Sequence, residues 1–243
     1  MKPLGSEKSL AARVSEAVRM AIVSGEFEPG RLYSVNDLAN QLGVSRTPVR
    51  EAIIRLSAAG MVRFERGRGI RILEITAKDL EEIFILRLLL EVPAARHAVS
   101  LMGMDQIETL KIHLEAMRSA ALRGDEHAMM ESDRSFHCAL LAPAGNVRLV
   151  ECIDGLRDIV LKRGKSTAGQ SRTLLDIVAE HDGVLSHVES GDADGTASAL
   201  AAHIQHTGRL LLLQEGAGGT DGSRLSIDWA AAHLGTFAAR EHG

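Results

Sequence analysis

Apolar residues recur at spacings of three and four along almost the whole chain, which is the period of an amphipathic α-helix. Beyond residue 76 the pattern predicts helices near residues 77–100, 105–123, 126–142, 146–162, 168–190 and 193–214. Their expected N-cap residues are Thr76, Asp105, Asn146 and Asp192. The sequence therefore predicts a mainly α fold whose C-terminal part is an antiparallel all-α helical bundle.

One short segment departs from the helical period. Met61–Glu65 and Ile70–Leu73 alternate apolar and polar residues on both sides of the turn Arg66-Gly67-Arg68-Gly69. Alternation around a Gly-rich turn predicts a β-hairpin. This hairpin is the only sheet of consequence that the sequence predicts.

Three helices are expected before the hairpin. A helix over residues 7–24 is followed by a short helix that Ser34 caps, and then by a third helix that ends near Ala59. Ser45 or Thr47 is the expected N-cap of the third helix. Short helices that meet at a Gly turn and are followed by a hairpin have the layout of a winged helix-turn-helix.

Length and charge indicate two domains and a tail. Typical domains hold about 100–150 residues, and this chain has 243. Residues 1–75 carry 12 Lys and Arg against 8 Asp and Glu, a net charge of +4, whereas residues 76–243 have a net charge of −8. A basic, phosphate-binding domain is therefore expected at 1–75, an acidic helical domain at 76–214, and a flexible linker with a possible last helix at 215–243.

The sequence offers no sign of a membrane association. No apolar run approaches the roughly 20 residues that a helix needs to cross a bilayer. The first residues lack the uninterrupted apolar stretch of a signal peptide. We therefore expect a cytoplasmic protein with no membrane partner.

Basic residues cluster where a winged helix-turn-helix meets DNA. Arg46 and Arg50 lie one turn apart at the start of the third predicted helix, away from its apolar stripe, so both can reach base edges in the major groove. At the hairpin tip, Arg66, Gly67 and Arg68 can approach the DNA backbone or the minor groove closely. Each feature alone fits a solvated helix or an ordinary hairpin, but their order and spacing favour DNA binding.

The N-terminal part resembles the GntR family of bacterial regulators. The match covers residues 10–73 and rests on Gly25, Pro29-Gly30, Leu38-Ala39, Leu42-Gly43-Val44-Ser45-Arg46-Thr47-Pro48-Val49-Arg50-Glu51-Ala52, Leu56, Gly60 and Arg66-Gly67-Arg68-Gly69. The resemblance implies that Arg46 and Arg50 contact the operator and that Thr47 contacts a phosphate. It also implies that Arg66 and Gly67 form the contact of the wing.

Two more residues belong to this expected interface. Ser45 begins the third helix, and Asn36 stands at the start of the second helix, where some members of the family carry Arg. A shorter contact is therefore expected from the second helix of this chain. The protein is expected to bind a palindromic operator as a homodimer, because the two-fold axis of such an operator mirrors that of a dimer.

Four residues of the helical part have the chemistry of metal ligands. Asp133 and His137 are four residues apart and so project from the same face of one helix, while His181 and His203 lie on two later helices. One carboxylate and three imidazoles suit zinc, nickel, manganese or iron, with positions left open for water or a ligand. Spacing alone fits four separate polar residues at least as well. His206, one turn beyond His203, is the alternative fourth ligand.

The helical part also resembles the metal-containing FCD effector domain of FadR-type GntR regulators. The likeness rests on Leu86-Arg87-Leu88-Leu89-Leu90-Glu91, Asp133-Arg134-Ser135-Phe136-His137, Gly145-Asn146, Glu180-His181, and Gly191-Asp192 followed by His203. It implies that the four residues above are the metal ligands. His187 lies off the His181 face of its helix, so we expect it to be exposed. It also implies that Arg87 faces the cavity, where it would bind the carboxylate of an effector. A salt bridge to Glu91 at i,i+4 fits Arg87 equally well.

These features favour a ligand-responsive transcription regulator, which we expect to be a repressor with a small carboxylate or sugar acid as its effector. The alternative is a metal-dependent enzyme fused to a DNA-binding head, because open metal positions can activate water. In that enzyme, Glu180 is the one candidate for a general base, and the winged helix-turn-helix takes no part in the reaction. An architectural DNA-binding protein would leave the metal residues without a purpose.

Overall fold

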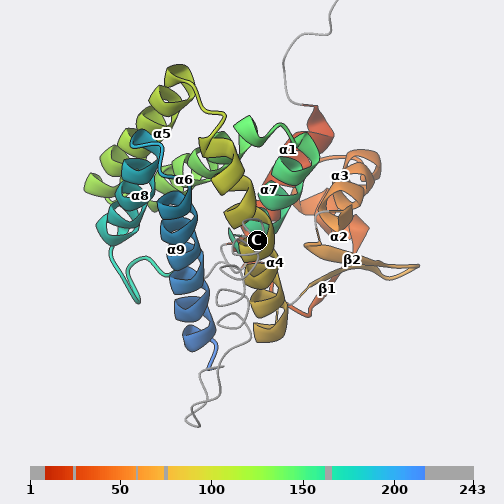
Figure 1. The fold of residues 1–243 in the computed structure, drawn as a ribbon. Helices are drawn as coiled ribbons and strands as arrows, with labels where there is room; N and C mark the ends of the chain where they lie inside the picture. Colours follow the sequence, from red (N-terminus) through yellow and green to blue (C-terminus); the bar gives the residue numbers. More distant parts are fainter. Residues whose placement is uncertain (1–8, 24–25, 59, 74–75, 162–165, 217–243) are drawn as a thin grey trace, which may run out of the picture. The chain divides into compact units, whose positions relative to one another are not determined.

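The computed structural model of the chain describes residues 9–23, 26–58, 60–73, 76–161 and 166–216 (Figure 1). The chain divides into two compact units. The first consists of Met1–Ile75 and Asp158–Lys165, and the second of Thr76–Arg157 and Ser166–Gly243. The described residues are mostly helical, as the hydrophobic period predicts, and the strands all lie in the first unit.

The first unit packs three helices over a small sheet. The helices are α1 (Leu10–Val23), α2 (Val35–Gln41) and α3 (Arg46–Ala58). Ser34 caps α2 as predicted, since its Oγ accepts a hydrogen bond from the backbone N–H of Asp37 at 3.1 Å. The shared core contains Val14, Val18, Leu38, Val49, Ile53, Leu56, Val62, Ile70 and Ile72. Burial of one apolar stripe per helix holds this small domain together.

The predicted hairpin is present and belongs to a three-stranded antiparallel sheet. Strands β2 (Val62–Glu65) and β3 (Gly69–Ile72) pair directly, and β1 (Leu32–Tyr33) adds to β3 in the order β1-β3-β2. The sequence missed β1 because two residues are too few to show an alternating pattern. Gly69 has φ of 129°, and a Cβ there would lie 2.1 Å from the backbone oxygen of Tyr33, so only glycine lets β1 approach β3.

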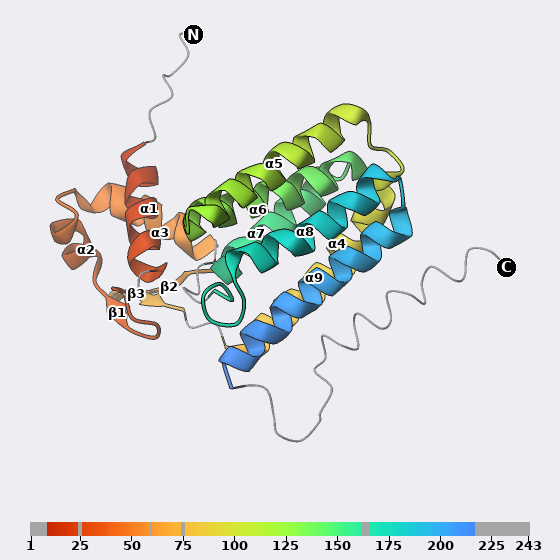
Figure 2. The same cartoon turned by 90° about the vertical axis from the view of Figure 1, so that its left-hand side faces the viewer.

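The second unit is an all-α bundle. Its helices are α4 (Ala77–Val99), α5 (Met104–Leu122), α6 (Glu126–Leu141), the 3-10 turn η1 (Ala142–Ala144), α7 (Val147–Leu161), α8 (Leu174–Glu189) and α9 (Ala193–Gln214). Helix α4 packs against α9 and α6, α5 packs against α6 and α8, and α8 packs against α9. Figure 2 shows α5, α6, α8 and α9 running alongside one another. Helices α6, α8 and α9 carry the candidate metal ligands.

Three of the four expected N-caps are confirmed. Thr76 forms a capping box with Asp79, Asp192 accepts from the N–H of Gly195, and Asn146 accepts from the N–H of Leu149. The expectation for Asp105 is wrong, because Gly103 occupies the N-cap position of α5. The side chain of Gln106 accepts from the N–H of Gly103, so a glycine with no side-chain oxygen still starts the helix.

The helix expected at 168–190 begins later than its hydrophobic pattern indicates. Thr173 caps α8, and its reciprocal bonds with Asp176 complete a capping box. Just before it, the backbone N–H groups of Ser171 and Arg172 both donate to the oxygen of Thr167 and close a turn. The last helix expected at Ile227–Arg240 lies outside the described residues.

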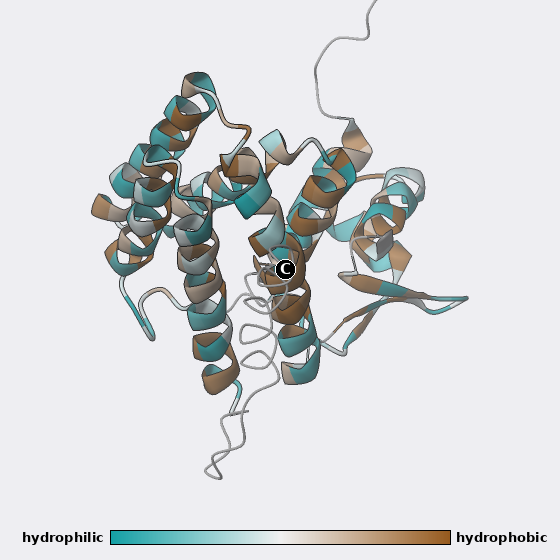
Figure 3. Cartoon of the chain, in the orientation of Figure 1, coloured by the Kyte–Doolittle hydropathy of each residue, from teal (hydrophilic) through white to brown (hydrophobic). Residues whose placement is uncertain are grey.

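Apolar side chains line the inside of the bundle. Figure 3 shows hydrophobic and hydrophilic residues alternating around most helices, as in amphipathic helices that bury one face. The largest fully buried side chains of this unit are Leu80, Phe84, Leu88, Leu110, Met117, Met129, Phe136, Leu140 and Leu141. Among the described residues, no helix combines the length and the apolar character that a membrane span requires.

Candidate nucleic-acid interface and metal centre

Helix α3 presents one apolar and one cationic face. Val49 and Ile53 are buried in the core, while Arg46 and Arg50 are exposed. Neither guanidinium group forms a hydrogen bond or an ion pair with another described residue. Two uncommitted cations one turn apart, in the first turns of a helix, are available to phosphates and base edges.

The smaller residues of the expected interface are also exposed. Asn36 in the first turn of α2 is exposed, as are Ser45 and Thr47. Ser45 directly precedes the first residue of α3, so it stands at the N-cap position. The alternative expectation, that Thr47 is the cap, is wrong because Thr47 is the second residue of the helix.

The tip of the hairpin is a turn that carries Arg66, Gly67 and Arg68. All three residues are exposed, and Gly67 has φ of 76°, a left-handed conformation that glycine adopts without strain. Arg68 lies 3.5 Å from Glu65, whose carboxylate is also bound by Arg71. Arg66 has no such partner among the described side chains, so of the two arginines it is the freer to bind a phosphate.

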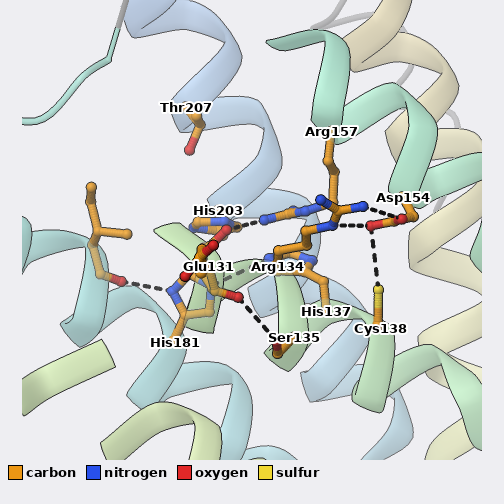
Figure 4. Close-up of polar contacts among 12 residues, drawn as sticks. Glu131, Arg134, Ser135, His137, Cys138, Asp154, Arg157, His181, His203 and Thr207 are labelled. Carbon is orange, nitrogen blue, oxygen red and sulfur yellow. Dashed lines mark hydrogen bonds and ion pairs between the residues drawn. The ribbon is translucent and has the colours of Figure 1, made fainter. Parts of the chain in front are cut away.

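The four candidate metal ligands converge in the helical unit. Helix α6 supplies Asp133 and His137, α8 supplies His181, and α9 supplies His203, and all four are buried. One ligand atom from each lies within 4.8 Å of the others. The Nε2 atom of His181 is 3.0 Å from Oδ1 of Asp133 and 3.3 Å from Nε2 of His137. Figure 4 shows the three imidazoles gathered between these helices.

Each histidine is held through its other ring nitrogen. The Nδ1 of His137 is 2.7 Å from Oε2 of Glu91, that of His181 is 2.8 Å from the backbone oxygen of Ile177, and that of His203 is 2.6 Å from Oε2 of Glu180. These oxygens only accept, so each Nδ1 carries a proton. The Nε2 atoms of His137 and His203 then turn a lone pair toward the centre, and Nε2 of His181 faces Oδ1 of Asp133. Metal-ligating histidines are oriented in this way.

Burial keeps two of these imidazoles neutral. It lowers the pKa of His137 to about 3, and the charge of Arg157 adds to the shift. It lowers the pKa of His203 to about 4, with the charge of His181 acting in the same direction. Both rings are therefore unprotonated at neutral pH, which is the form that binds a metal.

The acidic ligand is held ionised. Burial by itself would raise the pKa of Asp133, but the charge of Arg157 and the hydrogen bond from His181 hold it well below its usual value. Arg157 on α7 forms an ion pair with Oδ2 of Asp133, which leaves Oδ1 facing His181. The centre thus offers one carboxylate oxygen and three imidazole nitrogens.

The sequence analysis missed one charged residue of this centre, Arg157, and recognised only one of the two contacts of another, Glu91. Arg157 has no local signal, because its partner Asp133 lies 24 residues away on another helix. Glu91 was considered only as a partner of Arg87, whereas it is fully buried and also accepts from His137, 46 residues away. Burial would raise the pKa of Glu91, but the charge of Arg87 and the hydrogen bond from His137 keep it lowered.

Arg87 forms the salt bridge that the sequence left open as one of two possibilities. Its Nε is 2.6 Å from Oε1 of Glu91, and both side chains are buried. Its Nη2 atom has no hydrogen-bond partner among the described residues. The salt bridge therefore leaves part of the guanidinium group uncommitted.

Glu180 anchors the outer side of the centre. Its carboxylate binds Nδ1 of His203, Nδ1 of His206 at 2.8 Å, and Nη1 of Arg172 at 2.7 Å. Burial opposes ionisation, but these hydrogen bonds and charges hold the pKa of Glu180 at about 2, so it is a poor general base at neutral pH. His206 is exposed and lies outside the group of four. His187, expected to be exposed, is about half exposed and binds Asp192 at 2.9 Å.

Known proteins resemble the chain in both units. Residues 10–72 match the family described as bacterial regulatory proteins, gntR family, and residues 82–206 match the FCD domain. The Nta operon transcriptional regulator of Aminobacter aminovorans is 30% identical over 80% of this chain and 91% of its own length. The gluconate operon transcriptional repressor of Bacillus subtilis is 35% identical over 54% of each chain.

A solved structure shares the fold. The structure of E. coli McbR/YncC has a TM-score of 0.71 and 25% sequence identity, and the match covers 86% of this chain and all of that one. The two relatives above are named as transcriptional regulators, so the comparisons support a regulator and not a metal-dependent enzyme. The chain therefore belongs to the GntR family of bacterial transcriptional regulators, with a DNA-binding N-terminal domain and an FCD domain in its helical unit.

Proposed function

We propose that this regulator is a repressor whose DNA binding responds to a small acid bound at a metal ion in the FCD domain. The observation that carries the proposal is the orientation of the three histidines. Each is fixed through Nδ1 and turns Nε2 toward Asp133, within a group of ligand atoms no more than 4.8 Å apart. Histidines that ligate a metal adopt this orientation, with the other ring nitrogen bound to an oxygen.

Asp133, His137, His181 and His203 would hold one divalent ion. A set of three imidazoles and one carboxylate fits zinc, nickel, manganese or iron, and four protein ligands leave further positions open in a five- or six-coordinate ion. The bound ion supplies positive charge and these open positions. The protein supplies the orientation of the ligands and a water-poor surrounding of buried side chains.

The proposed effector carries a carboxylate, either in a simple carboxylic acid or in a sugar acid. A carboxylate oxygen can complete the coordination of a divalent ion, and the free Nη2 of Arg87 offers a second contact. A relative is named for gluconate, which is itself a sugar acid. Metal and effector are expected to bind cooperatively, because the ion offsets the negative charge of the ligand.

The proposed DNA complex is that of a homodimer on a palindromic operator in the bacterial cytoplasm. Arg46 and Arg50 would read bases, Thr47 would bind a phosphate, and Asn36 and Ser45 would make shorter contacts. Arg66, Gly67 and Arg68 would form the contact of the wing. Two copies multiply the affinity, because the second half-site binds at a high effective concentration. A relative named as a repressor supports the direction of regulation.

A thermal-shift screen of small carboxylates and sugar acids tests the effector site. The metal-loaded protein is screened beside the same protein treated with a chelator. A ligand that binds only the folded state raises the unfolding temperature, so at least one acid should stabilise the loaded protein and lose this effect after chelation. Stabilisation that is equal in both preparations would rule out a metal-assisted site.

A further inference from the structure

Two arginines near the metal centre carry buried donors for which the described residues provide no acceptor. Arg87 on α4 and Arg157 on α7 are only 4% and 6% exposed. The Nη2 of Arg87 and the Nε and Nη1 of Arg157 have no hydrogen-bond partner among the described residues. Of the four buried side-chain atoms in that condition, three belong to these two residues.

Unsatisfied buried donors are unusual in folded proteins, above all on charged groups. A buried donor without a partner loses its hydrogen bonds to water and gains none in return. The free energy that this costs exceeds the net contribution of a typical hydrogen bond to stability. Other buried or half-buried cations of the same unit are paired: Arg172, for example, binds Glu180, Thr167 and Thr207. The open donors of Arg87 and Arg157 therefore point to an acceptor that the described part of the chain does not provide.

Both guanidinium groups contact the shell of the metal centre directly. Arg157 is bound to Oδ2 of Asp133, a candidate ligand. Arg87 is bound to Oε1 of Glu91, whose Oε2 accepts from the candidate ligand His137. Burial lowers the pKa of Arg87, the charge of Glu91 opposes this shift, and the charge of Arg157 adds to it, so the two cations act on each other.

The buried charges show what the ligand must bring. The charged residues buried among the described residues of the helical unit are Arg87, Glu91, Asp133 and Arg157, which are two positive and two negative groups. The adjacent pair of Arg172 and Glu180 adds one charge of each sign. With the three imidazoles in the unprotonated form that binds a metal, these charges balance. A divalent ion adds two positive charges, and no further buried carboxylate of the described chain offsets them. A buried excess of two charges is strongly unfavourable unless a ligand neutralises it.

We infer that the effector is a dicarboxylic acid, one carboxylate of which completes the metal coordination while the other binds the open donors of Arg157 and Arg87. This inference rests on the proposed function and deepens it, because it sets the charge of the effector and assigns Arg157 to its binding. A dianion balances the buried charge, and a planar carboxylate matches the geometry of a guanidinium group.

The test compares diacids with their own monoamides. Isothermal titration calorimetry on the full-length protein, loaded with zinc or nickel, measures malonate, succinate and glutarate beside malonamate, succinamate and glutaramate. Each monoamide keeps the shape of its diacid and lacks one charge. At least one diacid should bind about tenfold tighter than its monoamide, which corresponds to about 1.4 kcal/mol.

Variants then assign the preference to the arginines. Arg157→Gln is expected to reduce the ratio between diacid and monoamide to about threefold or less, whereas Arg157→Lys keeps the charge but not the planar guanidinium donors and is expected to keep only part of the ratio. Arg87→Gln is the second variant, and metal content is measured in each protein. The control is Arg96→Gln, because Arg96 is partly exposed and pairs with the exposed Asp194, so its loss should leave the ratio unchanged.

Three results overturn the inference. They are equal binding of every diacid and its monoamide, a diacid preference that survives both Arg157→Gln and Arg87→Gln, and binding of inorganic phosphate in place of all the diacids. Failure of the proposed function has a different signature. In that case neither diacids nor monoamides bind the metal-loaded protein more tightly than the chelated protein, and the inference fails with it.

Discussion

At the scale of single residues, Glu91 and Glu180 decide which nitrogen of two histidines faces the metal centre. Each accepts a hydrogen bond from an Nδ1 atom, at 2.7 Å from His137 and at 2.6 Å from His203. Carboxylates in this position fix the tautomer and raise the basicity of the metal-binding nitrogen. They belong to the centre although neither is a candidate ligand.

Glu91→Gln is expected to weaken metal binding without abolishing it. The amide oxygen can still accept from Nδ1 of His137, but it removes the negative charge, and loss of such a partner typically lowers metal affinity about 10- to 100-fold. Competition with a chelator dye measures the affinity. Glu189→Gln is the matched control, because Glu189 pairs with Lys111 at the surface. An affinity equal to that of the wild type would show that Glu91 does not support the metal.

Acid should destabilise the metal-free protein through the same histidines. Burial lowers the pKa of His137 to about 3 and that of His203 to about 4, from an ordinary value of 6.5. As the pH falls below 6.5 the unfolded chain takes up protons that the folded chain does not, so the free energy of unfolding decreases, by about 1.4 kcal/mol per pH unit for each histidine. Chelator-treated protein should lose about 2 kcal/mol between about pH 7 and pH 5.5.

Urea unfolding at the two pH values measures this loss, and the double variant His137→Gln/His203→Gln provides the comparison. Carboxylates stay ionised in both states over this range, so they do not contribute to the difference. The double variant should lose markedly less stability than the wild type. An equal loss in both proteins would assign the pH dependence to other groups.

Residue-scale features differ in how far the sequence reveals them. Asp133 and His137 are one helical turn apart, so their shared face follows from spacing. Their convergence with His181 and His203 depends on which helices pack together, and only the family resemblance indicated it. Arg157 carried no signal at all, because an ion pair over 24 residues leaves no local pattern.

At the scale of elements, the helical period identified every long helix of the described chain. Helix starts were less predictable, because a capping residue competes with the apolar pattern. The apolar pattern predicted that a helix begins at residue 168. Thr173 and Asp176 form a capping box instead, and α8 begins at Leu174. Strand β1 escaped notice because its two residues are held by pairing with β3 and not by a pattern of their own.

Helix α3 is expected to read the operator through its first turns. Arg46→Ala and Arg50→Ala should each weaken specific binding by about 1–3 kcal/mol and reduce discrimination between operator and random DNA. Thr47→Ala should instead lower affinity evenly on all sequences. Gel-shift titration at fixed salt measures both. Arg55→Ala, in the last turn of the same helix, is the control, and equal losses from Arg55 and Arg50 would contradict base reading at the helix start.

Gly69→Ala should destabilise the winged unit far more than Gly67→Ala. At Gly69 a Cβ would meet the backbone of Tyr33 at 2.1 Å and the backbone would be strained, for an expected cost of about 2–4 kcal/mol. At Gly67 the space is open, so only the left-handed backbone costs energy, about 1 kcal/mol. Thermal unfolding separates the two, and equal melting temperatures would refute the role given to Gly69.

At the scale of the whole molecule, the two parts of the chain differ in net charge, and each part holds one of the two candidate sites. The first 75 residues have a net charge of +4 and hold the exposed arginines of α3 and of the hairpin tip. The remainder has a net charge of −8 and holds the buried centre. The proposed regulator combines DNA binding and ligand binding in one chain. Its ligand can change DNA binding only if it favours one of two states of the protein.

The proposed centre can be tested without knowledge of the operator or the effector. The central claim is that Asp133, His137, His181 and His203 together hold one divalent ion. Elemental analysis of the full-length protein, purified without chelator or affinity tag, measures this directly beside His137→Ala and the control His206→Ala, whose side chain is exposed and lies outside the group. We predict about one ion per chain in the wild type and in His206→Ala, and none in His137→Ala. A wild type without metal, or full occupancy in His137→Ala, would contradict the account.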